Sequence, residues 1–203
     1  MEKLVQPAKN ESLYRSADSG SANQYRIDVF ARSVREVVTG AGGWIVDRVL
    51  AGWIVTVITD AADDAERAGR ILGCEVTFRS AEADSARPRP YGIALSSALY
   101  STDAQLQRCV TDAFDHEIVE VSLIGARPSC PSDPRLRPVT YRPSAAAVAF
   151  KAHSLAAAGI PVSSVAITER FRSAVLTGDE DEQSRRVTRH LLTDDGVAAS
   201  SYR

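Results

Sequence analysis

Glycines followed by an acidic residue form the first group in this sequence with a possible role in chemistry. Gly40, Gly42 and Gly43 lie within four positions, and Asp60 follows where a strand is expected to end. Because glycine has no side chain, the backbone N–H groups of such a run can approach a pyrophosphate, and an acid further along can bond a ribose. These four residues are therefore a candidate site for a nucleotide or dinucleotide.

The stretch from Val37 to Ile45, VVTGAGGWI, resembles the TGxxGxxG turn of extended short-chain dehydrogenases. The resemblance implies cofactor binding at the glycines, with Asp60 as the ribose-binding acid. The sequence departs from the family pattern, since Val46 stands at the third glycine position. Ala147 also stands where a Tyr-x-x-x-Lys motif ending at Lys151 would need tyrosine. The alternative is a junction between two helices, in which small residues permit close packing.

Four arginines crowd a proline-rich loop that is predicted between residues 127 and 143. Guanidinium groups recognise phosphates and carboxylates through paired hydrogen bonds, so this loop is predicted to bind an anion or an acidic partner surface. A solvated loop without a ligand is the alternative, and it is the favoured interpretation. The arginines are Arg127, Arg135, Arg137 and Arg142.

The acidic residues and the histidines predict no metal site. A helical first turn is the favoured interpretation of one acidic cluster, because acids suit the positive end of a helix dipole, and a Mg²⁺ pocket is the alternative. The three histidines are isolated, and no Cys or His pair has ligand spacing. A helix end is likewise favoured over a general base at His116. No metal and no other cofactor is predicted; the acidic cluster comprises Asp60, Asp63, Asp64 and Glu66.

Hydrophobic periodicity predicts helices that alternate with strands. The segment from Trp53 to Phe78 reads as strand, helix and strand, which is a βαβ unit whose two strands should be parallel neighbours. Helices are predicted at 24–38, 44–50, 60–72, 103–114, 144–158 and 179–192, and strands at 53–59, 74–78, 91–100, 117–125 and 162–168.

This alternation predicts an α/β fold with a mainly parallel sheet flanked by helices. The expected core has three layers and is Rossmann-like, without a complete phosphate-binding loop. A single α/β domain is expected over residues 23–178. A flexible arm should precede it at 1–22, and a charged helix with a loose tail should follow at 179–203.

Charge and cysteine usage restrict the classes of partner and the location. The 203 residues include 24 Lys and Arg and 26 Asp and Glu, for a net charge of −2. This balance provides no general attraction for nucleic acid or for an anionic membrane. No apolar run approaches the roughly 18 residues of a membrane span. Three cysteines without a pairing pattern, of which Cys74 and Cys109 are expected in the core, favour the cytoplasm.

The leading hypothesis for function is a non-enzymatic regulatory or interaction protein of the bacterial cytoplasm, with another protein as its partner. It depends on the absence of a Walker-type loop and of a G-x-S-x-G nucleophile motif. A small nucleotide- or dinucleotide-binding enzyme is the alternative. The pattern GGW-x₃-R-x₃-GW-x-VTV, followed by RILG, resembles uncharacterised actinobacterial proteins over about residues 40–75. That resemblance implies no activity.

Overall fold

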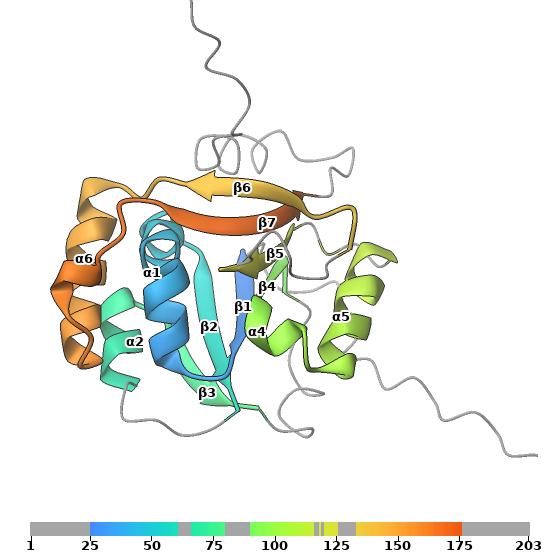
Figure 1. Cartoon of the computed structure of the whole chain (residues 1–203), viewed down its shortest axis with the longest axis horizontal. Helices are drawn as coiled ribbons and strands as arrows, with labels where there is room; N and C mark the ends of the chain where they lie inside the picture. The colour runs from blue at the N-terminus through green and yellow to red at the C-terminus, as the bar shows by residue number, and fades with distance from the viewer. Residues whose placement is uncertain are drawn as a thin grey trace, which may run out of the picture.

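One sheet of seven strands organises the part of the chain that the computed structural model describes, namely residues 25–60, 66–79, 90–115, 118, 120–125 and 133–175. The strand order is β3-β2-β1-β4-β5-β7-β6 (Figure 1). The first five strands in this order are parallel, and β7 runs antiparallel to both β5 and β6. The strands are β1 (Arg26–Ala31), β2 (Ile54–Thr59), β3 (Glu75–Phe78), β4 (Gly92–Ser96), β5 (Glu120–Ile124), β6 (Arg137–Tyr141) and β7 (Glu169–Val175).

Helices cover both faces of this sheet, and each face has its own apolar cluster. One cluster joins the sheet to α1 (Val34–Leu50), α2 (Glu66–Leu72) and α6 (Ala145–Ala157), and the other to α4 (Ser97–Tyr100) and α5 (Ala104–Asp115). Figure 1 shows these two groups of helices on opposite sides of the central strands. The expected α/β fold with a mainly parallel, helix-flanked sheet is therefore confirmed.

The βαβ unit predicted from Trp53 to Phe78 is present. Strands β2 and β3 are parallel neighbours, with Thr56 opposite Glu75 and Thr59 opposite Phe78. Helix α2 connects them and buries Ala68 and Leu72 against the same core as α1. The predicted start of this helix, at residues 61–65, lies outside the described residues.

The helix predicted at 24–38 is wrong in its first half, because Arg26–Ala31 forms the central strand β1. This strand is covered on both faces, so Val29 and Ala31 pack into one cluster and Phe30 into the other. A strand buried on both faces shows an apolar run without alternation. Such a short run can be mistaken for the apolar face of a helix. The second half of the prediction joins the expected helix at 44–50 to form one helix, α1, which Ser33 caps by accepting from the Glu36 N–H.

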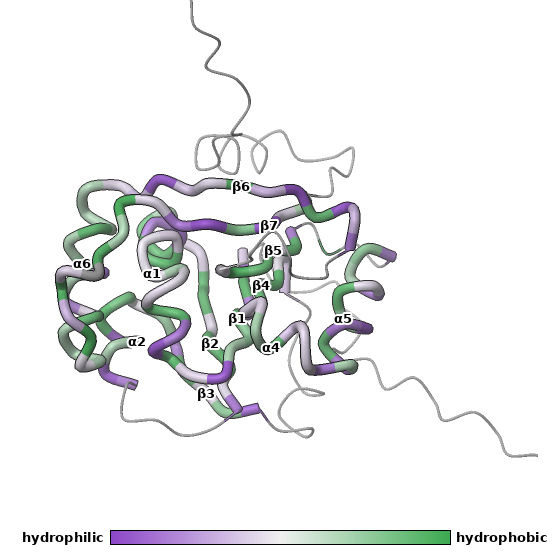
Figure 2. The backbone as a smooth tube through the Cα atoms, in the orientation of Figure 1, coloured by the Kyte–Doolittle hydropathy of each residue, from purple (hydrophilic) through white to green (hydrophobic). Residues whose placement is uncertain are grey.

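Two further differences concern the last part of the described chain. The strand expected at 162–168 is a short 3-10 turn, Val162–Ser164, and strand β7 begins only at Glu169. The loop expected at 127–143 contains edge strand β6. In Figure 2 the central strands β2 and β5 are mostly coloured hydrophobic, whereas β6 and β7 carry hydrophilic segments. This polarity explains why hydrophobic patterning missed them.

The ends of the chain carry predictions that stay untested. The arm at 1–22, the helix at 179–192 and the tail lie outside the described residues. Cys74 and Cys109 are buried as expected. No helix of the described segments combines the length and the hydrophobicity needed to cross a membrane.

The glycines of α1 are packing contacts inside a continuous helix. A Cβ atom at Gly43 would lie 2.5 Å from Cγ of Pro143, and one at Gly40 would lie 2.7 Å from a methyl carbon of Ile124. At Gly42 the closest atom would be Cγ of Lys151, at 3.2 Å. The small residues therefore let α6 and the segment before it approach α1.

Because their neighbours differ, the glycines of α1 should differ in how much stability is lost when a side chain is added. We expect Gly43→Ala to lower the free energy of unfolding by about 1–3 kcal/mol, because overpacking against a proline ring outweighs the gain in helix propensity. Gly42→Ala should cost clearly less, since the flexible Lys151 side chain can shift. Urea unfolding of both variants measures the difference, and an equal loss at the two positions would contradict this account.

Candidate functional site

The carboxyl ends of β1 and β4 form the candidate site. The chain leaves β1 through α1 toward β2 on one side of it, and later returns to add β4 on the other side. The strand order therefore reverses between β1 and β4. Open α/β sheets bind their ligands at such a point, outside the carboxyl ends of the strands.

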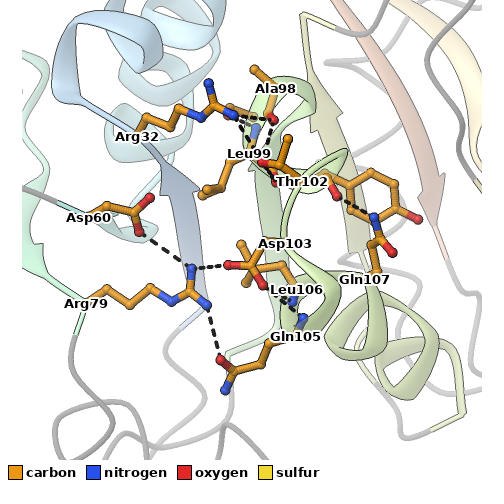
Figure 3. A network of polar contacts seen from close by, with 12 residues as sticks. Arg32, Asp60, Arg79, Ala98, Leu99, Thr102, Asp103, Gln105, Leu106 and Gln107 are labelled. Atoms are coloured by element: carbon orange, nitrogen blue, oxygen red, sulfur yellow. Dashed lines mark hydrogen bonds and ion pairs between the residues drawn. The ribbon is translucent and has the colours of Figure 1, made fainter.

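Arg79, which follows β3, connects three elements at this edge. Its guanidinium donates to Oδ2 of Asp103 at 2.6 Å and to Oε1 of Gln105 at 3.3 Å. It also lies 3.5 Å from Oδ1 of Asp60, at the end of β2 (Figure 3). The backbone N–H of Arg79 donates to the carbonyl of Thr59. Arg79 thus fastens the first turn of α5 to the ends of β2 and β3.

Asp103 is the acid on which this contact depends. Burial opposes its ionisation, but the Arg79 guanidinium and the backbone N–H groups of Leu106 and Gln105 hold the pKa of Asp103 below its usual range. Oδ1 of Asp103 accepts from those two N–H groups at 3.0 and 2.9 Å. Asp103 therefore caps α5.

Arg32, directly after β1, has a different environment. Its guanidinium donates through one nitrogen to the carbonyl of Ala98 at 3.1 Å and to Oγ1 of Thr102 at 3.0 Å. Its backbone N–H donates to Oε2 of Glu36 in the first turn of α1. Within the described segments, no carboxylate forms an ion pair with this exposed guanidinium. Among the described residues, the guanidinium of Arg32 is therefore held by two neutral oxygens, beside the N-terminus of α1 (Figure 3).

The structure does not bring together the predicted nucleotide site. Asp60 lies at the carboxyl edge, beside Arg79. Gly40, Gly42 and Gly43 lie inside α1, which begins at Val34, so at about 1.5 Å rise per residue they are roughly two turns away from that edge. A phosphate-binding turn requires glycines between the strand and the helix, and Arg32 and Ser33 occupy that place here.

The predicted arginine cluster is also not assembled among its described members. Arg135 forms a bidentate ion pair with Asp133 and lies 3.9 Å from the ring centre of Phe114. Arg137 begins β6 and Arg142 follows it, so the length of that strand separates them. Arg127 lies outside the described residues. The loop is partly a strand, which spaces these side chains along an edge.

The acidic cluster and the histidines add no further centre. Glu66 pairs with Arg70 on the exposed face of α2, and His153 is exposed on α6. Asp63, Asp64 and His116 lie outside the described residues. Over the described ranges, no group of three or more His, Cys, Asp or Glu side chains is placed to hold a metal ion.

Sequence reasoning missed Arg32, Arg79 and Asp103. A usable signal existed for Arg79, because it directly follows a predicted strand, as Asp60 does. Arg32 was hidden because β1 was read as helix, which removed the strand end that makes its position informative. Asp103 was taken as the first residue of a helix rather than its cap.

Comparisons with known proteins give a fold likeness at low identity. No family model matches the chain, and no curated protein matches its sequence. The A40926 pseudoaglycone deacetylase Dbv21 is similar with a TM-score of 0.49 and 11% identity, over 77% of this chain and 100% of that one. A deacetylase of teicoplanin biosynthesis gives 0.48 and 9%, over 75% and 100%. A conserved protein from Thermus thermophilus, TT1542, gives 0.45 and 14%, over 77% and 98%.

These comparisons correct the functional hypothesis. The two deacetylases are enzymes, which contradicts the expected non-enzymatic regulatory or interaction role, and that hypothesis is withdrawn. The nucleotide-enzyme alternative loses its basis as well, because its glycines lie inside α1. At these identities the likeness concerns the fold, and it assigns neither a substrate nor a catalytic residue to this chain.

The contact between Arg79 and Asp103 should make stability depend on acidic pH. Because the folded state lowers the pKa of Asp103, the contact stabilises the protein above the usual aspartate pKa of about 4 and is lost as pH falls through the lower folded value. We expect Arg79→Met to cost about 1 kcal/mol near neutral pH, since both side chains are partly exposed. The difference from wild type should shrink as pH falls below about 4.

Urea unfolding at several pH values measures this difference, with Arg70→Met as the matched control on the surface of α2. A difference that stays constant down to the lowest pH at which the protein folds would show that Arg79 acts by packing and not by charge.

Proposed function

We propose that this chain is an enzyme of small-molecule chemistry that binds an anionic group, a carboxylate or a phosphate, at the carboxyl edge between β1 and β4. The observation that carries the proposal is the guanidinium of Arg32. It is fixed at the point where the strand order reverses, and no acid among the described residues neutralises it.

The donors that Arg32 leaves unused suit an oxyanion. A guanidinium has five N–H donors in a planar fork, and the contacts of Arg32 within the described chain use a single nitrogen of its side chain. The neutral acceptors on Ala98 and Thr102 orient the group without reducing its charge. Arginine forks of this kind bind carboxylates and phosphates through paired hydrogen bonds.

The neighbouring charges leave this role to Arg32. Arg79 is close by, but Asp60 and Asp103 already balance it. Glu36 contributes a negative charge in the first turn of α1, where it accepts the backbone N–H of Arg32. The start of the 17-residue helix α1 adds partial positive charge at the same place.

The same proposal includes the finer fold class and the location. The parallel order β3-β2-β1-β4-β5 supports a Rossmann-like core, in which ligands bind where the strand order reverses. Buried free thiols at Cys74 and Cys109 support a reducing compartment such as the cytoplasm. The deacetylases named above make deacetylation the first reaction to assay.

The test compares anion binding by the wild type with that by Arg32→Ala. Inorganic phosphate, citrate and acetate are titrated against sodium chloride of equal ionic strength, and the melting temperature is recorded. An anion at 100 times its Kd should stabilise the wild type by about 2.7 kcal/mol. Arg32→Ala should lose this response, whereas Arg70→Ala, an exposed arginine on α2, should keep it.

An equal response in the Arg32→Ala protein would place any anion elsewhere and contradict the proposal. So would a wild type that responds to the three anions no more than to chloride.

A further inference from the structure

Glu169, the first residue of β7, buries a carboxylate in the middle of the molecule. Its side chain is 1% exposed, and the side chain of its partner Lys151, on α6, is 0% exposed. A buried charge of this kind is tolerated only when other groups neutralise it and satisfy its hydrogen bonds. The groups that do so here form an unusual set.

The carboxylate binds two consecutive backbone amides in the interior of α1. Oε1 accepts from the N–H of Gly43 at 2.8 Å and from Nζ of Lys151 at 2.6 Å. Oε2 accepts from the N–H of Trp44 at 2.8 Å. Adjacent backbone N–H groups together with an ammonium group are a donor set with which proteins hold carboxylates and phosphates.

The glycine run makes this approach possible. A Cβ atom at Gly43 would lie 3.2 Å from Oε1 of Glu169 and would collide with the ring of Pro143. At this position the missing side chain therefore exposes the backbone of a mid-helix residue to an anion. The anion is a side chain of the same protein rather than a cofactor.

We propose that Gly43, Trp44 and Lys151 form a carboxylate-binding site in its own right, called here the amide–lysine site, which Glu169 occupies as an internal ligand. The site acts as a latch, because filling it attaches β7 to α1 and α6 at one point. It does not depend on the function proposed for the carboxyl edge, and a small carboxylate such as formate or acetate should bind it when Glu169 is shortened.

The surroundings of the site define the charges that act on it. Burial raises the pKa of Glu169, whereas Lys151 and the two amides oppose that rise. Asp47, one turn along α1 from Gly43, accepts hydrogen bonds from Tyr141 of β6 and from Ser144. Arg48 forms an ion pair with Glu120. Lys151 is therefore the cation available to a carboxylate at this site among the described residues.

Chemical rescue tests the proposal. Glu169→Ala leaves the Lys151 ammonium buried without its acid, so its melting temperature should fall well below that of the wild type. Sodium formate and sodium acetate should restore part of the loss, more than sodium chloride of equal concentration. The tryptophan fluorescence should return toward the wild-type spectrum; Trp44, whose ring lies 5.6 Å from that of Phe171, contributes to it together with Trp53.

A double variant provides the control. Glu169→Ala with Lys151→Met removes both charges, so it should melt above Glu169→Ala alone and should not respond to formate. Equal responses to formate and chloride, or the same formate response in the double variant, would overturn the carboxylate-binding site.

Glu169→Gln keeps the test open if the alanine variant does not fold. The amide retains an acceptor but loses the charge, so hydrogen exchange at the Gly43 and Trp44 amides should become at least several-fold faster. The exposed Glu66→Gln on α2 is the matched control and should leave both rates unchanged. If the two amides of Glu169→Gln exchange as slowly as those of the wild type, the proposal that Glu169 attaches β7 to α1 is wrong.

Discussion

Strand β1 is the constraint on which the rest of the structure depends. It pairs in parallel with β2 over six positions and with β4 over four, and it is covered on both faces. The chain must therefore leave its carboxyl end at once and cross back along the sheet to begin β2. This path fixes Arg32 at the point where the strand order reverses. It also carries the middle of α1 over the sheet, where Glu169 of β7 reaches it.

Within the described residues, buried cationic side chains are paired with carboxylates, whereas the guanidinium of Arg32 at the carboxyl edge is not. Inside the described core, Arg48 is paired with Glu120 and lies over the rings of Trp44 and Trp53, and Lys151 is paired with Glu169. Removing one partner of such a buried pair would cost about 3–5 kcal/mol, because it leaves the other charge buried and unpaired. Arg32 lies at the edge, where water reaches it, so the same cost does not arise. A charge without an acid is tolerated there, and it remains available to a ligand.

Exposed backbone amides in the glycine run can bind either a cofactor phosphate or a carboxylate of the same protein. Glycines that expose backbone amides to an anion suggested a bound pyrophosphate, and Gly43 does donate its amide to an anion. The anion is Glu169, which lies 126 residues further along the chain. Within the described residues, the run therefore acts in assembly, by joining β7 to α1, and the carboxyl edge is left to other residues.

Local patterns in the sequence determined much of the fold. Four features could be predicted because each depends on neighbours within a few positions. They are the β-branched run of β2, the amphipathic α5, the alanine-rich α6 and the βαβ unit. The sequence also placed Asp60 correctly at a strand end. Tertiary structure decided the rest. The strands β1, β6 and β7 depend on partners that are distant in sequence. The same is true of the contact of Arg79 with Asp103 and of the pairing of Glu169 with Gly43, Trp44 and Lys151. Hydrophobic periodicity records which face of a segment is buried, but not which distant residue meets it there, and that meeting decides where charge is matched and where it stays free.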